Sequence, residues 1–244
     1  MKMYAANDGS LRLNKNDSHE TESSYDFIPI KGMLIPSQQL AMANSSYAYD
    51  RRYEKVLALR TELLMRRQST EQAYMMAILS ACAGEGRSQL AAELAIAFAK
   101  MNRPTLLIDA DFRRPKQHVL FSTDNHSGLS QVKESDETPD LFGVKDLPQM
   151  LVMTTGEIPD NPLELLLSEK FALMIEYLRD NFEFVVIDTP PVSKFSDGLV
   201  IANLVSNVIT LSRAKHTSYR HMRDMLRRLS ATNSQILGGV INHF

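Results

Sequence analysis

Residues 80–89 read SACAGEGRSQ, between an apolar run that ends at Ser80 and a helical pattern that begins near Leu90. The stretch matches the phosphate-loop pattern G-x-x-x-x-G-K-[ST], except that Ala81 replaces the first glycine and Arg87 replaces the lysine. A loop of this kind aims backbone N–H groups and a helix N-terminus at an anion. Its place between a predicted strand and a predicted helix indicates a phosphate site, although GEGRS alone is equally compatible with a tight structural turn.

Each residue type in this loop has a physical role toward phosphate. Gly84 and Gly86 permit a tight turn and a close approach of the backbone to oxygen. Arg87 keeps the positive charge of the absent lysine but changes its geometry, because a planar guanidinium binds phosphate through two N–H groups. Ser88 supplies the hydroxyl expected on Mg²⁺. The predicted nucleotide-binding residues are Ala83, Gly84, Glu85, Gly86, Arg87, Ser88 and Gln89.

Three aspartates stand at the predicted carboxyl ends of two other apolar runs. LLIDADFRRP places Asp109 and Asp111 after one run, and FVVIDTPP places Asp188 at the end of another. In an open parallel sheet these strand ends line the crevice where ligands bind. Any one aspartate could start a turn or cap a helix. Asp197 is interpreted as such an N-cap, and the alternative is a residue that supports the site from behind. The three together, beside a phosphate loop, favour a site for Mg²⁺ and a hydroxyl nucleophile.

Short apolar runs alternate with helical stretches along the rest of the chain. The predicted strands are MMAILS, TLLIDAD, QMLVMTT, FVVIDT, NVITLS and ILGGVIN. Continuous apolar runs are typical of strands buried on both faces, and a strand, helix, strand succession implies right-handed crossovers. We therefore predict an α/β fold, doubly wound, with a mainly parallel sheet and helices on both faces. Residues 114–147 lack periodicity and are predicted to be surface loops, with a short helix at GLSQV.

The N-terminal part of the chain has a different composition. Residues 1–45 are mostly polar and are predicted to form a mobile arm, with one docking patch around FIPIKGMLIP. Residues 46–244 are predicted to form a single domain. The run YDRRYEKVLALRTELLMRR opens this domain as an amphipathic helix. Its predicted apolar face consists of Val56, Leu59, Leu63 and Met65.

Composition limits the partners and the compartment. The 27 basic and 29 acidic residues give a net charge of −2, which supplies no general field for nucleic acid, so no nucleic-acid partner is expected. Arg220, Arg223, Arg227 and Arg228 form a basic helix face that is predicted to meet solvent or a protein partner. The single cysteine indicates a reducing compartment, and no apolar run reaches the roughly 18 residues of a membrane helix. We therefore expect a cytoplasmic protein.

Four stretches together resemble the bacterial tyrosine kinases of polysaccharide export, relatives of the MinD and ParA ATPases: SACAGEGRS, LLIDADFRRP, TTGEIPDNPLELLLS and FVVIDTPP. The resemblance covers about residues 50–244. Within the family, GEGRS and the closing ILGGVINHF are most similar to the EpsG-like branch associated with chain-length determinants. The resemblance implies a P-loop fold, ATP and Mg²⁺ as cofactors, and tyrosine autokinase activity that regulates exopolysaccharide chain length, polymerisation and export.

The resemblance also implies roles for individual residues. Asp109 would orient and deprotonate the tyrosine hydroxyl, Asp111 would support the metal shell, and Asp188 would hold Mg²⁺. Arg87 would steady the transferring charge, so the implied catalytic residues are Arg87, Asp109, Asp111 and Asp188. The implied metal residues are Ser88, Asp109 and Asp188. The implied partner is the cytoplasmic tail of a transmembrane polysaccharide chain-length-determinant protein, which would recruit the chain to the inner membrane.

The tyrosines depart from the family pattern. Family members usually end in a tyrosine cluster, whereas the last tyrosine here is Tyr219. We hypothesise that N-terminal tyrosines are the acceptors; the alternative is that they pack at a surface or an interface. These candidates are Tyr4, Tyr25, Tyr47, Tyr49 and Tyr53.

A second departure concerns self-association. The family's Glu-x-x-Arg-x-x-Arg helix is matched by Glu54 and Arg60 but interrupted by Leu57. Since one charged contact is missing, self-association through Glu54 and Arg60 is expected to depend on a partner. An ordinary surface helix whose charges repeat every three residues is the alternative. These departures keep a second function open, an ATP-binding oligomerisation switch of the same export machinery that phosphorylates no tyrosine.

Overall fold

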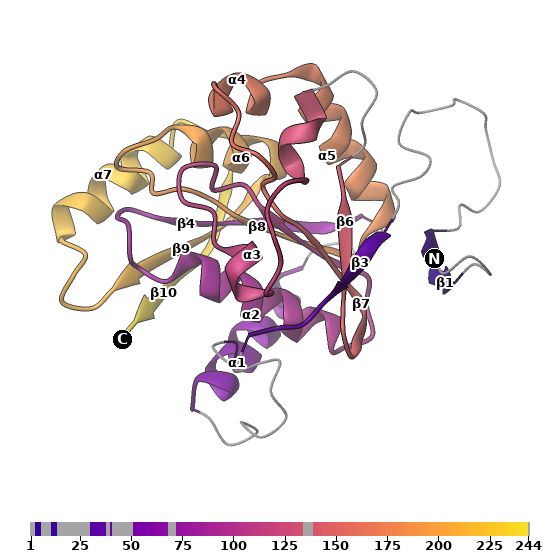
Figure 1. The fold of residues 1–244 in the computed structure, drawn as a ribbon. Coiled ribbons are helices and arrows are strands. Elements are labelled where there is room, and N and C mark those ends of the chain that lie inside the picture. The colour runs from indigo at the N-terminus through magenta and orange to yellow at the C-terminus, as the bar shows by residue number, and fades with distance from the viewer. Residues whose placement is uncertain are drawn as a thin grey trace.

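The computed structural model describes residues 3–5, 11–13, 30–37, 40, 51–67, 72–133 and 139–243 of the chain. A sheet of eight strands forms the centre of the fold (Figure 1). A separate antiparallel pair joins β1 (Met3–Ala5) to β2 (Leu11–Leu13). From edge to edge, the strands of the main sheet are β10 (Gln235–Asn242), β9 (Asn207–Arg213), β4 (Tyr74–Ser80), β8 (Phe184–Asp188), β5 (Thr105–Asp109), β7 (Leu147–Met153), β6 (Leu141–Val144) and β3 (Ile30–Leu34).

The central strands are buried on both faces, as their continuous apolar runs predict. Every residue of β4, β5 and β8 is buried, and the strands from β9 across to β7 all pair in parallel. The predicted α/β fold with a mainly parallel, doubly wound sheet is therefore confirmed. In the β5–β8 pair Asp109 lies opposite Asp188, so two of the predicted site carboxylates meet at the carboxyl ends of these central strands.

Helices cover both faces of the sheet (Figure 1). One apolar layer contains α1 (Arg51–Arg66), α2 (Arg87–Ala99) and α3 (Gln117–Leu120). The other contains α4 (Pro162–Leu166), α5 (Glu169–Asn181), α6 (Asp197–Val205) and α7 (Tyr219–Leu229). The alanine-rich α2 lies close against the sheet, where the ring of Phe98 stacks on Phe184 with 4.1 Å between centroids. Within the described ranges, no helix combines the length and the apolar character needed to cross a bilayer.

The predicted amphipathic helix is α1, but its apolar face differs from the predicted one. Leu59 packs there as predicted, and Leu57 and Leu64 join it. Val56 and Leu63 are buried in the layer that contains α2, whereas Met65 is 80% exposed. The predicted place of Met65 on this face is wrong because residues two apart on a helix point to different sides. An ion pair of 2.8 Å between Arg52 and Glu93 ties the same helix to α2.

The prediction of surface loops for residues 114–147 is wrong in part. Residues 117–120 form α3, and β6 folds back antiparallel on β7. The short helix predicted at GLSQV is present as a 3-10 turn over Leu129–Lys133. Leu129, Val132 and Leu141 are buried there, so this segment adds to the core although no periodic pattern announces it.

Part of the segment predicted as a docking patch is β3. It pairs in parallel with β6 at the edge of the sheet, and Leu34 is buried there. The division of the chain at residue 45 stays a prediction. Among the hypothesised acceptors, Tyr25, Tyr47 and Tyr49 lie outside the described residues.

Candidate nucleotide and magnesium site

The loop between β4 and α2 has the backbone of an anion site. Gly84 and Gly86 have φ values of 76° and 98°, a region that L side chains rarely adopt. A Cβ atom at Gly86 would also lie 2.6 Å from Nδ2 of Asn242, so glycine is required there. In the described part of the chain no side chain caps the start of α2, and its first backbone N–H groups therefore remain available to an anion.

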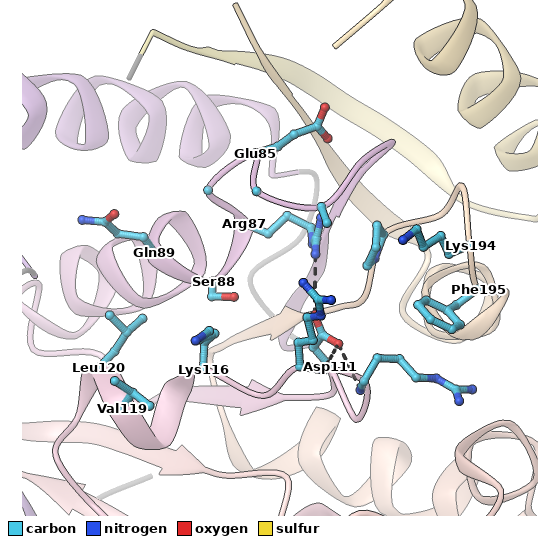
Figure 2. Close-up of a pocket in the computed structure, with 16 residues that line it drawn as sticks. Glu85, Arg87, Ser88, Gln89, Asp111, Lys116, Val119, Leu120, Lys194 and Phe195 are labelled. Atoms are coloured by element: carbon cyan, nitrogen blue, oxygen red, sulfur yellow. Dashed lines mark hydrogen bonds and ion pairs between the residues drawn. The ribbon is translucent and has the colours of Figure 1, made fainter. Parts of the chain in front are cut away.

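Three hydrogen bonds to Glu85 hold this loop from the side away from the predicted nucleotide. The carboxylate of Glu85 is fully buried and accepts hydrogen bonds from the backbone N–H of Cys82 at 2.8 Å and from the hydroxyl of Thr217. Nδ2 of Asn242, at the end of β10, donates to the carbonyl oxygen of Glu85 at 3.0 Å. Figure 2 shows the Glu85 side chain pointing away from Ser88. The side chain of Glu85 thus shapes the loop, and only its backbone faces the ligand side.

The guanidinium of Arg87 is turned into the loop, and this residue is only 7% exposed. Nε donates to the carbonyl oxygen of Thr189 at 2.6 Å, while Nη1 donates to the carbonyl oxygen of Cys82 at 3.0 Å and to the Ser80 hydroxyl. Nη2 lies 3.6 Å from Oδ2 of Asp111 (Figure 2). Arg87 therefore stiffens the loop and places a fixed positive charge beside the carboxylates of Asp111 and Asp188.

Asp188, at the end of β8, is the strongest candidate ligand for a divalent cation. Its carboxylate is fully buried, and Oδ2 accepts a hydrogen bond from Nε2 of Gln117 at 3.0 Å. Oδ1 has no hydrogen-bond partner among the described residues. Burial raises the pKa of Asp188 to about 6, even though the nearby Arg87 guanidinium and hydrogen bonding from the Ser88 hydroxyl to this carboxylate lower it. A cation at Oδ1 would satisfy an oxygen that is otherwise costly to bury.

The oxygens of Asp188 and Ser88 suit Mg²⁺ bound together with a nucleotide better than a metal ion coordinated by protein side chains only. Within the described ranges, no three His, Cys, Asp or Glu side chains are arranged to bind a metal ion. Mg²⁺ commonly takes one or two protein oxygens and completes its shell with water and phosphate oxygens. The carboxylate of Asp188 and the hydroxyl of Ser88, in the first turn of α2, suit that pattern.

Asp109 is the last residue of β5, and Asp111 lies two residues beyond the strand. The carboxylate of Asp109 is fully buried and accepts three backbone N–H bonds, from Asp111 at 3.1 Å and from Lys116 and Gln117 at 2.9 Å each. Burial and the neighbouring charge of Asp188 raise the pKa of Asp109 well above its ordinary value, against the lowering effect of the backbone bonds. Asp109 therefore fixes the turn that carries Asp111.

A cavity of about 600 Å³, a volume suited to a nucleotide, opens over the loop (Figure 2). All the predicted nucleotide-binding residues, Ala83 to Gln89, line this cavity, and Asp111 lines it as well. Asp109 and Asp188 are fully buried and are not among the lining residues. Four basic side chains also line the cavity: Arg113, Arg114, Lys116 and Lys194.

Sequence reasoning missed some residues that organise the site. The buried Gln117 donates through Nε2 both to the carbonyl oxygen of Ser88 and to Asp188, which links the loop helix to the end of β8. Asp197, interpreted from the sequence as an N-cap, instead binds Arg113 through Nε at 3.0 Å and Nη2 at 3.3 Å. The N-cap position of α6 belongs to Ser196. In the sequence, only the basic pair Arg113 and Arg114 in the FRRP run is a signal for an ion pair such as Arg113–Asp197. No sequence pattern indicates the contacts of Gln117.

Known proteins resemble this chain both in sequence and in fold. No protein-family model matches it. Over 190 residues it is 32% identical to the tyrosine-protein kinase CapB of Staphylococcus aureus. The aligned residues make up 78% of this chain and 83% of CapB. The chain belongs to the bacterial tyrosine kinases. A second bacterial tyrosine kinase, YwqD of Bacillus subtilis, is 31% identical over 166 residues, which is 68% of this chain and 70% of YwqD.

Solved structures agree with this family assignment. The chimerical protein CapA2B2 superposes with a TM-score of 0.75 at 29% identity, covering 89% of this chain and 95% of the chimera. The kinase domain of Escherichia coli Etk superposes with a TM-score of 0.74 at 26% identity, covering 92% of this chain and 82% of that domain. MinD of Pyrococcus horikoshii, solved with Mg-ADP, shares the fold at a TM-score of 0.58 and 18% identity. The P-loop fold of a bacterial tyrosine kinase is thus confirmed.

The self-association residues of this bacterial tyrosine kinase lie in different surroundings. Glu54 is exposed on α1. Nη1 of Arg60 donates to the carbonyl oxygen of Ala97 in α2 at 2.9 Å, so this arginine is engaged within the chain. Self-association through Glu54 and Arg60 stays a prediction, and Arg60 would have to serve both contacts.

Proposed function

We propose that this bacterial tyrosine kinase transfers the γ-phosphoryl group of Mg·ATP to tyrosine on itself or on a neighbouring copy. The observation that carries the proposal is the buried carboxylate of Asp188, with Oδ1 unpartnered among the described residues, next to a glycine loop that opens α2. Backbone N–H groups of residues 83–89 would bind the phosphates. Ser88 and Asp188 would hold Mg²⁺, which when bound supplies positive charge at the β- and γ-phosphates.

The contact with the tyrosine hydroxyl is better assigned to Asp111 than to Asp109. Asp109 is enclosed, and its carboxylate is occupied by three backbone N–H groups. Asp111 lines the cavity, and its Oδ1 accepts backbone N–H bonds from Arg113 and Arg114. Among the described residues, Oδ2 of Asp111 makes only the 3.6 Å contact with Arg87. A general base must come within hydrogen-bond reach of the proton it accepts. We therefore propose that Asp111 receives the proton, and that Asp109 supports the turn and the metal shell from behind. Arg87 steadies the developing charge on the phosphoryl group through the loop.

The test is incubation of the purified protein with Mg·ATP, followed by intact-mass measurement and phosphopeptide mapping. Phosphotyrosine is expected with the wild type and is expected to disappear in Asp188→Asn. Asp180→Asn, at an exposed position of α5, is the matched control and should keep the wild-type level. Asp111→Asn should lower transfer while leaving ATP affinity within about threefold of wild type. Undiminished phosphotyrosine in Asp188→Asn would contradict the proposal.

One observation favours a second candidate, a nucleotide-driven switch without tyrosine phosphorylation. The Arg87 guanidinium is committed to the carbonyl oxygens of Thr189 and Cys82, so it is less free than a loop lysine to follow the moving phosphoryl group. Binding of Mg·ATP would then change oligomer or partner contacts. Size-exclusion chromatography with and without Mg·ATP measures association of the same protein. Association that depends on the nucleotide, together with no phosphotyrosine in the mass measurement, would establish the switch and exclude the kinase.

We further propose that the chain regulates exopolysaccharide chain length, polymerisation and export from the cytoplasm. Its partner would be the cytoplasmic tail of a transmembrane polysaccharide chain-length-determinant protein, which would bring it to the inner membrane. Membership of the bacterial tyrosine kinases supports this proposal. Fractionation of cells with and without that partner is the test, and the chain is expected in the membrane fraction only when the partner is present. Equal distribution in both strains would overturn the recruitment.

A further inference from the structure

One tyrosine stands apart among those whose side chains the structure describes, namely Tyr53, Tyr74, Tyr177 and Tyr219. Tyr74 is buried at 7% exposure, and Tyr53 and Tyr177 are half-buried. The side chain of Tyr53 also carries the ammonium group of Lys100 over its ring, 5.3 Å from the centroid. Tyr219 is 80% exposed. Its hydroxyl is therefore accessible to another protein molecule without unfolding of the chain.

The start of α7 holds Tyr219 beside the phosphate loop. Immediately before it, the Thr217 hydroxyl donates to Glu85, and Nε2 of His216 lies 3.2 Å from the carbonyl oxygen of Ala83. Ser218 caps α7 by accepting from the backbone N–H of His221 at 3.2 Å, so the helix start is fixed. Tyr219 thus sits on a rigid element at the rim of the site, the kind of placement that makes a reacting group available at low entropic cost.

The ring of Tyr219 nevertheless does not enter the cavity of its own molecule. It is absent from the residues that line that cavity, and its high exposure places it toward solvent. Since the helix cap fixes the backbone at this point, the cavity that the hydroxyl can enter belongs to a second copy of the chain.

The surroundings of Tyr219 also suit the product of phosphorylation. The guanidinium of Arg223, one helical turn further on, lies 5.9 Å from the ring centroid of Tyr219. Arg220 is the next residue and is exposed. A phosphate on the hydroxyl would carry between one and two negative charges near neutral pH and would form charge-assisted hydrogen bonds with such arginines.

We propose that Tyr219 is an acceptor of phosphoryl transfer between two copies of this chain. The inference rests on the proposed kinase function and names the substrate group of that site. The phenolic oxygen of Tyr219 forms a bond to the γ-phosphorus of ATP in the other copy, and the bond from that phosphorus to the bridging oxygen breaks. ADP leaves with the bond electrons, and the phenolic proton passes to Asp111 of that other copy and then to water. The products are ADP, a proton and phosphotyrosine at position 219.

A mixing experiment with two distinguishable copies tests the inference. One copy carries Tyr219→Phe with an intact site; the other carries Asp188→Asn with Tyr219 intact and a mass tag. With Mg·ATP, phosphate is expected on Tyr219 of the tagged copy. When each variant is incubated alone, Tyr219→Phe should have about tenfold less total phosphotyrosine than the wild type. The control Tyr177→Phe, at a half-buried position of α5 that is not a candidate acceptor, should change it by less than about twofold. ATP affinity measured for Tyr219→Phe should equal that of the wild type, because Tyr219 lies outside the cavity.

The outcomes separate this inference from the proposed function. Phosphotyrosine that persists in Tyr219→Phe and maps to other tyrosines would overturn the inference and leave the kinase function standing. Phosphate on Tyr219 of the wild type but not of the tagged copy would overturn transfer between copies. Bound ATP with no phosphotyrosine at any position would overturn the proposed function and the inference together.

Discussion

At the scale of single residues, the neighbouring carboxylates of Asp109 and Asp188 differ in whether their oxygens have hydrogen-bond partners. They lie opposite each other across β5 and β8, and both are fully buried. Asp109 accepts three backbone N–H bonds, whereas Oδ1 of Asp188 has no partner within the described ranges. Asp109 is therefore part of the scaffold, while Asp188 stores a cost that a bound cation removes.

The same substitution is expected to have opposite effects at these two positions. In nucleotide-free protein near neutral pH, Asp188→Asn should raise the melting temperature by several degrees, because it removes a buried charge and keeps an acceptor for Gln117. Asp109→Asn should lower the melting temperature, because an amide N–H₂ would face backbone N–H donors. Differential scanning fluorimetry measures both. The same direction of change in the two variants would contradict this account.

The pKa of Asp188 adds a pH dependence to this difference. The pKa of Asp188 is raised to about 6 in the fold, so protonated Asp188 stabilises the folded state relative to the unfolded state. This stabilisation is lost as the pH rises through about 6. The melting temperatures of wild type and Asp188→Asn should converge near pH 4 and separate as the pH increases to about 7, with the variant higher. A constant difference across this range would show that the charge of Asp188 is not responsible.

Arg87 gives a second prediction at this scale. Arg87→Lys should lower the free energy of unfolding by about 1–3 kcal/mol, since an ammonium group cannot reach Thr189, Cys82 and Ser80 together. The same variant should raise the rate of phosphoryl transfer per bound nucleotide, because the freed cation can follow the phosphoryl group. Urea unfolding and single-turnover kinetics measure the two effects. Unchanged stability would mean that the contacts of Arg87 contribute nothing net.

The phosphate loop and the strand-end aspartates could be predicted from the sequence, since each depends on residues close together in the chain. The contacts between Gln117 and Asp188, and between Arg113 and Asp197, span 71 and 84 residues. Such partners are selected by the fold, and a glutamine or an arginine carries no local pattern that announces them. The inward orientation of Arg87 also depends on Thr189, which is distant in sequence.

At the scale of elements, β10 supports the phosphate loop through Asn242. Asn242→Ala should lower nucleotide affinity by about three- to tenfold, because the carbonyl oxygen of Glu85 loses its amide partner and the loop gains freedom. Asn207→Ala is the matched control. The amide of Asn207 donates to the carbonyl oxygen of Met75 at 3.0 Å, and Asn207 begins β9, at the opposite end of the sheet from the phosphate loop. Both variants should lose about 1 kcal/mol of stability. Calorimetric titration with Mg·ADP should show weaker binding only for Asn242→Ala.

Elements with continuous apolar runs were predictable, and elements with mixed roles were not. The helical stretch PLELLLSEKFALMIEYLRD reads as one helix, but Ser168 caps a new helix there and separates α4 from α5. Its hydroxyl accepts from the backbone N–H of Phe171 at 3.2 Å, a local preference that competes with continued helix. The strand β6 escaped prediction because only its pairing with β7 and β3 identifies it.

At the scale of the whole molecule, the distribution of charge matters more than its sum. The chain carries a net charge of only −2, yet basic side chains gather around the cavity at the carboxyl end of the sheet. Arg113 is neutralised in part by Asp197, whereas Lys116 and Lys194 are exposed at the rim. Clefts lined by one sign of charge raise the local concentration of an oppositely charged ligand. A nearly neutral protein can thus concentrate positive charge where a triphosphate would bind.

Lys194→Ala should therefore weaken ATP binding by about three- to tenfold and ADP binding by less, because ATP carries one more phosphate toward the open rim. The control is Lys145→Ala, a lysine that is also exposed, just before β7 and at the sheet end opposite the cavity. That variant should bind both nucleotides like the wild type. Titrations at low and high salt measure the effect, and the loss in Lys194→Ala should shrink as salt screens the charge. Equal losses in both variants would mean that net charge, and not its placement, sets the affinity.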